Sequence, residues 1–194
     1  WFDLSTTKEP YRVEGKKTMG LELAEQFNWD LPDVIIFPTG GGVGIIGMWK
    51  SFAEMEKVGL IKEKRPRMIV VQAEGCAPLA KAFLENKEKT EEWKNASTIA
   101  SGLRVPKPFA DFLVLKAIRE SQGEALSVSE SEIIQSLKEM AHLEGIFVGP
   151  EGAAALAGLK KLISEDKIAK NEKVILFNTG SGLKNIETLK RILT

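Results

Sequence analysis

The sequence predicts an α/β domain of the three-layer αβα type, in which a mainly parallel sheet lies between two layers of helices. Three runs that are apolar at nearly every position support this fold: residues 34–37, 68–71 and 173–177. They do not alternate with polar residues, as expected of strands that are buried on both faces. Segments with helical periodicity separate them, an order typical of parallel sheets.

The first half of the chain contains the first two of these strands. Residues 1–14 are polar, and we expect turns there, since Pro10 disfavours helix just before it. Helices are predicted at about 16–27, from the glycine run to about 58, and at about 78–85. Residues 86–108 lack regular periodicity, and we expect a long surface loop, which is often functional.

The second half continues the alternation. We predict a helix at 109–121, a short extended piece at 127–129, and a helix from the capping-box pattern Ser129-x-x-Glu132 to about 143. A short strand is expected at 146–148 and an alanine-rich helix at 151–163, followed by the last strand, a second glycine turn and a final helix. With 194 residues, the chain is long enough for one domain with a sizeable core.

The composition excludes several classes of function. There are 27 basic and 27 acidic residues, which argues against a dedicated nucleic-acid-binding protein. One cysteine, Cys76, excludes an internal disulfide and fits a reducing, cytoplasmic compartment. No run approaches the roughly 18 apolar residues of a membrane span. No cluster of histidine, cysteine and acidic residues has metal-ligand spacing, so no metal site is expected.

Gly40, Gly41, Gly42 and Gly44 follow the first predicted strand and precede a helix. This geometry points unpaired backbone N–H groups and the positive end of the helix dipole at an anion, and we expect a bound phosphate. A plain strand-to-helix turn is the alternative. A P-loop is excluded because Gly-Lys-Ser/Thr is missing, and the formal GxGxxG match at 42–47 lacks an acidic strand end about 20 residues later.

Other polar residues each allow a functional and a structural interpretation. In the second glycine turn, residues 178–182, the hydroxyls of Thr179 and Ser181 could hydrogen-bond an aromatic nitrogen of a ligand or cap a helix. Glu151 could face a ligand, or it could simply be a first-turn carboxylate that the helix dipole stabilises. Arg12 could bind a substrate anion or lie in solvent. A further group is interpreted as structural, with no chemistry expected: buried Cys76, surface or capping His142, and the solvated pair Lys16 and Lys17.

Longer segments carry a resemblance to a known family. IFPTGGGVGIIGMWKSF, VQAEGCAPLAKAF, IASGLRVPKPFADFLVLKAIRES, GPEGAAAL and FNTGSGLK, in this order, resemble the threonine synthases, as does PYRVEGKKT. These are fold-type II pyridoxal-phosphate enzymes, related to tryptophan synthase β chain and threonine dehydratase. The resemblance covers essentially the whole chain.

The resemblance implies a role for each candidate residue. The backbone N–H groups of Gly40, Gly41, Gly42, Val43 and Gly44 would bind the phosphate of pyridoxal 5'-phosphate. Thr179 would hydrogen-bond the pyridine nitrogen, and Glu151 would lie near the cofactor ring. Arg12 matches the arginine that contacts the substrate phosphate. Thr6 and Thr7 stand where many threonine synthases have an Asn-Ser pair, and would also bind the substrate.

One departure concerns the lysine that binds the cofactor covalently. In the family it lies in an SFKDR-like motif, which this sequence lacks. We therefore expect residues 1–194 to form the large, C-terminal domain of an enzyme, inactive without its small domain and a homodimer at full length. The implied reaction converts O-phospho-L-homoserine and water to L-threonine and phosphate. A pyridoxal-phosphate ammonia-lyase acting on threonine or serine and a non-catalytic anion-binding module are the alternatives.

Overall fold

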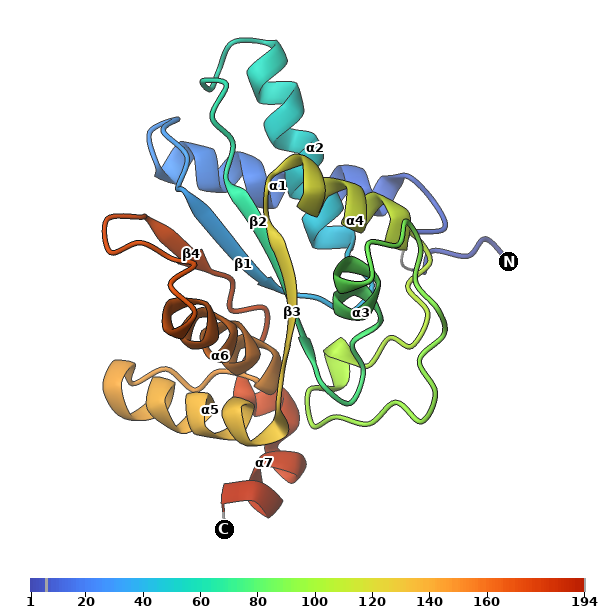
Figure 1. Ribbon diagram of the computed structural model, residues 1–194, viewed down its shortest axis with the longest axis vertical. Helices are drawn as coiled ribbons and strands as arrows, with labels where there is room; N and C mark the ends of the chain where they lie inside the picture. Colours follow the sequence, from blue (N-terminus) through green and yellow to red (C-terminus); the bar gives the residue numbers. More distant parts are fainter. Residues whose placement is uncertain (6, 194) are drawn as a thin grey trace.

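The computed structural model describes residues 1–5 and 7–193, and it confirms the three-layer architecture (Figure 1). Within these residues, four parallel strands form one sheet in the order β3-β2-β1-β4. Their bounds are β1 Val34–Pro38, β2 Arg67–Ala73, β3 Glu124–Val128 and β4 Val174–Leu176. The carboxyl ends of all four strands therefore lie at one edge of the sheet.

Helices cover both faces of the sheet, with α5 and α6 on the side opposite α1 and α2 (Figure 1). The helices are α1 Tyr11–Gln26, α2 Val43–Lys57, α3 Pro78–Leu84, α4 Asp111–Glu120, α5 Glu130–Glu144, α6 Pro150–Ser164 and α7 Ile186–Leu193, and the 3-10 turns are η1 Ser101–Leu103 and η2 Gly182–Asn185. No helix among the described residues is both long and apolar enough to cross a bilayer.

The two faces of each central strand contribute to different hydrophobic cores. In β1, Ile35 and Phe37 pack with α1 to α4, whereas Val34 and Ile36 pack with α5 and α6. Successive side chains of a strand point to opposite faces, so a strand that is apolar throughout serves two cores at once. This division explains why the buried runs do not alternate in sequence.

The amino-terminal helix begins earlier than the sequence pattern indicated. Turns were expected through residue 14, but α1 begins at Tyr11 and Pro10 is its N-cap residue. The carboxylate of the preceding Glu9 accepts a hydrogen bond from the backbone N–H of Arg12 at 3.0 Å and another from that of Tyr11. A buried carboxylate thus satisfies N–H groups that a helix start leaves without partners. The expectation of turns was wrong for residues 11–14.

The strand expected at 146–148 is also absent from the sheet. Val148 forms only an isolated antiparallel bridge with Ser181. Around it, the N–H of Gly149 donates to the carbonyl of Gly180 at 2.8 Å, and the N–H of Gly182 donates to that of Phe147 at 2.9 Å. The segment instead connects the start of α6 to the second glycine turn.

The third strand is longer than the extended piece predicted at 127–129, since β3 begins at Glu124.

Candidate functional site

Both glycine loops line one pocket of about 430 Å³ beside the carboxyl end of β1. The turn η1 and the first turn of α6 complete its wall. All the residues predicted to bind the cofactor line this pocket: Gly40, Gly41, Gly42, Val43, Gly44, Glu151 and Thr179. Residues more than 130 positions apart thus meet at the sheet edge where parallel α/β folds bind ligands.

The first glycine loop leads directly from β1 into α2. Gly42 is the N-cap residue of α2 and has φ +85°, a conformation that only glycine adopts without strain. A side chain at this position would also overlap Cγ2 of Val114 in α4. At Gly41, in contrast, an added Cβ would meet no atom within 4 Å. The loop therefore packs tightly against α4 at Gly42 and is open at Gly41.

The loop offers a set of unpaired hydrogen-bond donors. Among the described residues, no acceptor is paired with the backbone N–H groups of Gly40, Gly41, Gly42, Val43 or Gly44. They lie at the amino end of α2, where the helix dipole adds a partial positive charge. Unpaired N–H groups at a helix start and open space above Gly41 are what a phosphate group requires. The site thus fits a phosphorylated ligand.

Glu151 connects two walls of the pocket. It lies in the first turn of α6, and its Oε1 accepts a hydrogen bond from the N–H of Gly102 in η1 at 2.8 Å. The carboxylate positions η1 against the glycine loop. Its role near a cofactor ring remains a prediction.

The two hydroxyls of the second glycine turn have different surroundings. The Ser181 hydroxyl accepts a hydrogen bond from the N–H of Leu183 at 3.2 Å and caps η2, so the capping interpretation holds for this residue. Thr179 lines the pocket, and its hydroxyl has no hydrogen-bond partner among the described residues. Thr179 is therefore available to a ligand.

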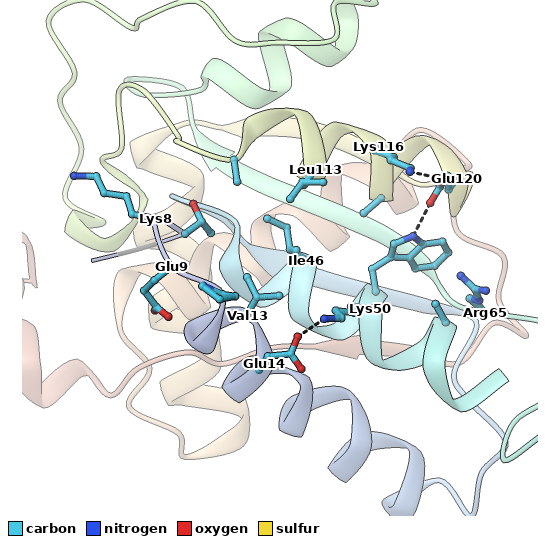
Figure 2. A pocket seen from close by; sticks show the side chains of 16 residues that line it. Lys8, Glu9, Val13, Glu14, Ile46, Lys50, Arg65, Leu113, Lys116 and Glu120 are labelled. Atoms are coloured by element: carbon cyan, nitrogen blue, oxygen red, sulfur yellow. Dashed lines mark hydrogen bonds and ion pairs between the residues drawn. The ribbon is translucent and has the colours of Figure 1, made fainter. Parts of the chain in front are cut away.

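The predicted substrate-binding residues lie elsewhere. Arg12 is exposed on α1, and its Nη1 donates to the carbonyl of Leu4 at 3.0 Å. Thr7 lines a second hollow of about 620 Å³ between α1, α2 and α4, where Val13, Ile46 and Leu113 supply apolar surface (Figure 2). Thr6 lies outside the described residues. Substrate binding by these three residues remains a prediction.

Two lysines that line the glycine-loop pocket were not expected there. Lys16 comes from α1 and Lys184 from η2. Lys16 lies four residues after Arg12, hence one helical turn along the same face of α1, and this spacing was the signal that could have identified it.

Of the residues interpreted as structural, Cys76 is buried, which raises the pKa of its thiol, and His142 is exposed in the last turn of α5.

Comparison with known proteins places this site in a family. A family model described as pyridoxal-phosphate dependent enzyme matches residues 1–180. The chain belongs to this family. Pyridoxal 5'-phosphate is thus its cofactor, and its phosphate fits the unpaired N–H groups of the glycine loop.

Curated relatives of this pyridoxal-phosphate family member include threonine synthases. That of Methanocaldococcus jannaschii is 40% identical over 91% of this chain and 43% of the relative. That of Mycobacterium tuberculosis H37Rv is 35% identical over 95% of this chain and 49% of the relative. The chain thus spans about half the length of the curated relatives it matches.

Solved structures with the same fold include a threonine deaminase and an L-serine ammonia-lyase. The processed threonine deaminase isoform 2 of Solanum lycopersicum has a TM-score of 0.74 at 20% identity, covering 95% of this chain and 50% of the other. An L-serine ammonia-lyase of Rhizomucor miehei has a TM-score of 0.72 at 20% identity, with 92% and 56% covered. At this identity the likeness establishes the fold.

Proposed function

We propose that this chain forms the cofactor-binding large domain of a threonine synthase, which converts O-phospho-L-homoserine and water to L-threonine and phosphate. The observation that carries the proposal is the pocket lined both by the glycine loop, with its unpaired N–H groups, and by Thr179, whose hydroxyl has no partner among the described residues. Similarity of 33–40% identity to threonine synthases supports this reaction over others that use the same cofactor.

In this proposal the chain binds and orients the cofactor. The N–H groups of residues 40–44 bind its phosphate, and the Thr179 hydroxyl donates to its pyridine nitrogen, which keeps that nitrogen uncharged. When bound, pyridoxal phosphate supplies an electron sink for carbanion chemistry. Because an uncharged pyridine nitrogen makes the bound cofactor a weaker electron sink, elimination would be favoured over transamination. Arg12, with Thr6 and Thr7, contacts the substrate phosphate.

The remaining parts of the expected enzyme are proposals as well. The lysine that binds the cofactor covalently comes from a small domain. In the family this lysine lies in an SFKDR-like motif, and residues 1–194 do not contain that motif. The full-length protein is a cytoplasmic homodimer. An ammonia-lyase acting on threonine or serine is the second candidate, because the solved structures that share the fold include both activities.

The deciding experiment uses the full-length protein loaded with pyridoxal phosphate. O-phospho-L-homoserine and L-threonine are supplied separately, and release of phosphate and ammonia is followed. Phosphate from the first substrate, matched by threonine formed, supports the synthase. Ammonia from the second substrate, without phosphate from the first, contradicts it and identifies the lyase.

A further inference from the structure

Lys16 is an exposed residue whose ammonium group has no acidic partner among the described residues. It lines the glycine-loop pocket together with residues 39–44. No ion pair or hydrogen bond joins that ammonium to any of the described residues. Lys184 lines the same pocket, also without an ion pair in the described part of the chain.

The packing of α1 on α2 determines where the Lys16 side chain starts. A Cβ added to Gly47 of α2 would lie 2.6 Å from the Cβ of Lys16, so the two helices touch at this position. Gly47 is only four residues after Val43, the first residue of α2. The lysine stem therefore begins beside the first turns of the helix whose N–H groups face the pocket.

The charges around Lys16 are already paired with one another. On the same helix, Glu14 forms ion pairs with Lys17 at 2.7 Å and with Lys50 of α2. Lys17 also pairs with Glu54 of α2 at 2.6 Å. This network holds the neighbouring lysine and leaves Lys16 outside it.

Lys16 and Arg12 form a cationic strip on one face of α1. Residues four apart in a helix are neighbours, and like charges at this spacing are unfavourable unless an anion lies between or beside them. The guanidinium of Arg12 is bonded to a backbone carbonyl and to no carboxylate in the described chain. The strip ends at the pocket whose loop N–H groups also have no acceptor among the described residues.

We propose that Lys16 is a specificity-determining cation that binds a phosphate monoester in this pocket. The proposal rests on the function proposed above, and two sources supply that chemistry: the phosphate of pyridoxal 5'-phosphate and the phosphate of the substrate. In both cases the ammonium forms a charge-assisted hydrogen bond to a phosphate dianion. The other oxygens of the cofactor phosphate would face the loop N–H groups, and those of the substrate phosphate would face Arg12. Removing that bond should weaken phosphate binding about tenfold.

The test uses Lys16→Gln in the full-length protein, with Lys17→Gln as the matched control. Both changes remove one positive charge from α1, one residue apart, but Lys17 points into the ion-pair network. Binding of pyridoxal phosphate to the apoprotein is titrated by fluorescence. Binding of inorganic phosphate to the holoprotein is titrated by calorimetry, and KM for O-phospho-L-homoserine is measured.

Each source has its own signature. About tenfold weaker binding of pyridoxal phosphate by Lys16→Gln identifies the cofactor phosphate. Unchanged cofactor binding with about tenfold weaker inorganic phosphate binding, and an equal rise in KM, identifies the substrate phosphate. In either case Lys17→Gln stays within twofold of the unmodified protein, and Lys16→Arg restores binding.

The proposal is overturned if Lys16→Gln changes neither affinity by more than Lys17→Gln does. A folding defect is excluded by thermal unfolding, since glutamine keeps most of the lysine stem that packs at Gly47. The two binding titrations need no turnover. If the unmodified enzyme releases no phosphate from O-phospho-L-homoserine, the proposed function fails, and the role of Lys16 is still decided by its affinities.

Discussion

At the scale of single residues, two adjacent glycines of the same loop have different reasons to be glycine. Gly42 has φ +85° and contacts Val114, whereas Gly41 borders open space in the pocket. Gly42→Ala should therefore lower the free energy of unfolding by about 1–3 kcal/mol and weaken cofactor binding. Gly41→Ala should leave unfolding of the apoprotein unchanged and weaken cofactor binding only, because its methyl group lies where the ligand fits.

Two measurements on each variant separate these causes. Urea unfolding of the apoprotein gives the stability, and fluorescence titration with pyridoxal phosphate gives the affinity. Equal destabilisation by the two substitutions would contradict the assignment of backbone strain to Gly42 alone.

Residues of the site could be predicted from the sequence where the signal was local. The run Gly40 to Gly44 predicts an anion-binding turn, with a plain strand-to-helix turn as the alternative, because it directly follows a predicted buried strand. The spacing from Arg12 to Lys16 places both residues on one face of α1, but it does not show that this face reaches the pocket. That depends on how closely α1 packs on α2 at Gly47, which no local pattern of the sequence indicates. Lys16 was therefore interpreted as part of a solvated face.

At the scale of elements, two carboxylates bind the long loop between α3 and α4 to the helices α5 and α6, which cover the sheet face opposite α1 and α2. Glu151 of α6 accepts from the N–H of Gly102 at 2.8 Å, and Glu130 of α5 accepts from the N–H of Ile99 at 3.0 Å. Each acid lies in the first turn of its helix, where a negative charge is favoured. The loop wall of the pocket is thus positioned by two helix starts.

Removing one carboxylate should release one amide. In Glu151→Ala we expect the Gly102 N–H to exchange with solvent roughly tenfold faster, and in Glu130→Ala the Ile99 N–H, because a hydrogen bond to a charged group contributes about 1.5–3 kcal/mol. Hydrogen exchange measured by NMR checks both. Glu151→Gln keeps an oxygen acceptor and should retain protection. Loss of protection at both amides in either variant would show that the loop opens as one unit.

Element types could be predicted more reliably than their ends. The buried strands at 34–37 and 68–71 and the capping box at Ser129 and Glu132 are confirmed, since these signals are local. The run 173–177 does form a strand, but β4 lies at the sheet edge and is only half-buried. The start of α1 was missed because it depends on the Glu9 carboxylate, which is buried only in the folded chain. Residues 146–148 have the composition of a strand, but their partner is the turn at Ser181 rather than a neighbouring strand.

At the scale of the whole molecule, Asp33 connects three strands at the edge opposite the pocket. It precedes β1, and its Oδ2 accepts a hydrogen bond from the N–H of Lys173, just before β4, at 2.8 Å. Its Oδ1 forms an ion pair with Lys64, and its backbone carbonyl accepts from the N–H of Arg67 in β2 at 2.9 Å. The ammonium of Lys64, followed by the Lys173 N–H, lowers the pKa of this carboxyl.

This pKa predicts how stability depends on pH. A carboxyl with a lowered pKa in the folded state stabilises the protein above its ordinary pKa of about 4, and the stabilisation is lost as pH falls toward the folded value. Asp33→Asn should therefore lower the free energy of unfolding at pH 7 by about 1–2 kcal/mol, and the difference from the unmodified protein should shrink progressively below about pH 4. Urea unfolding at pH 7 and pH 3 measures both. A deficit for Asp33→Asn that is equal at the two pH values would mean that the side chain acts through its shape and not through its charge.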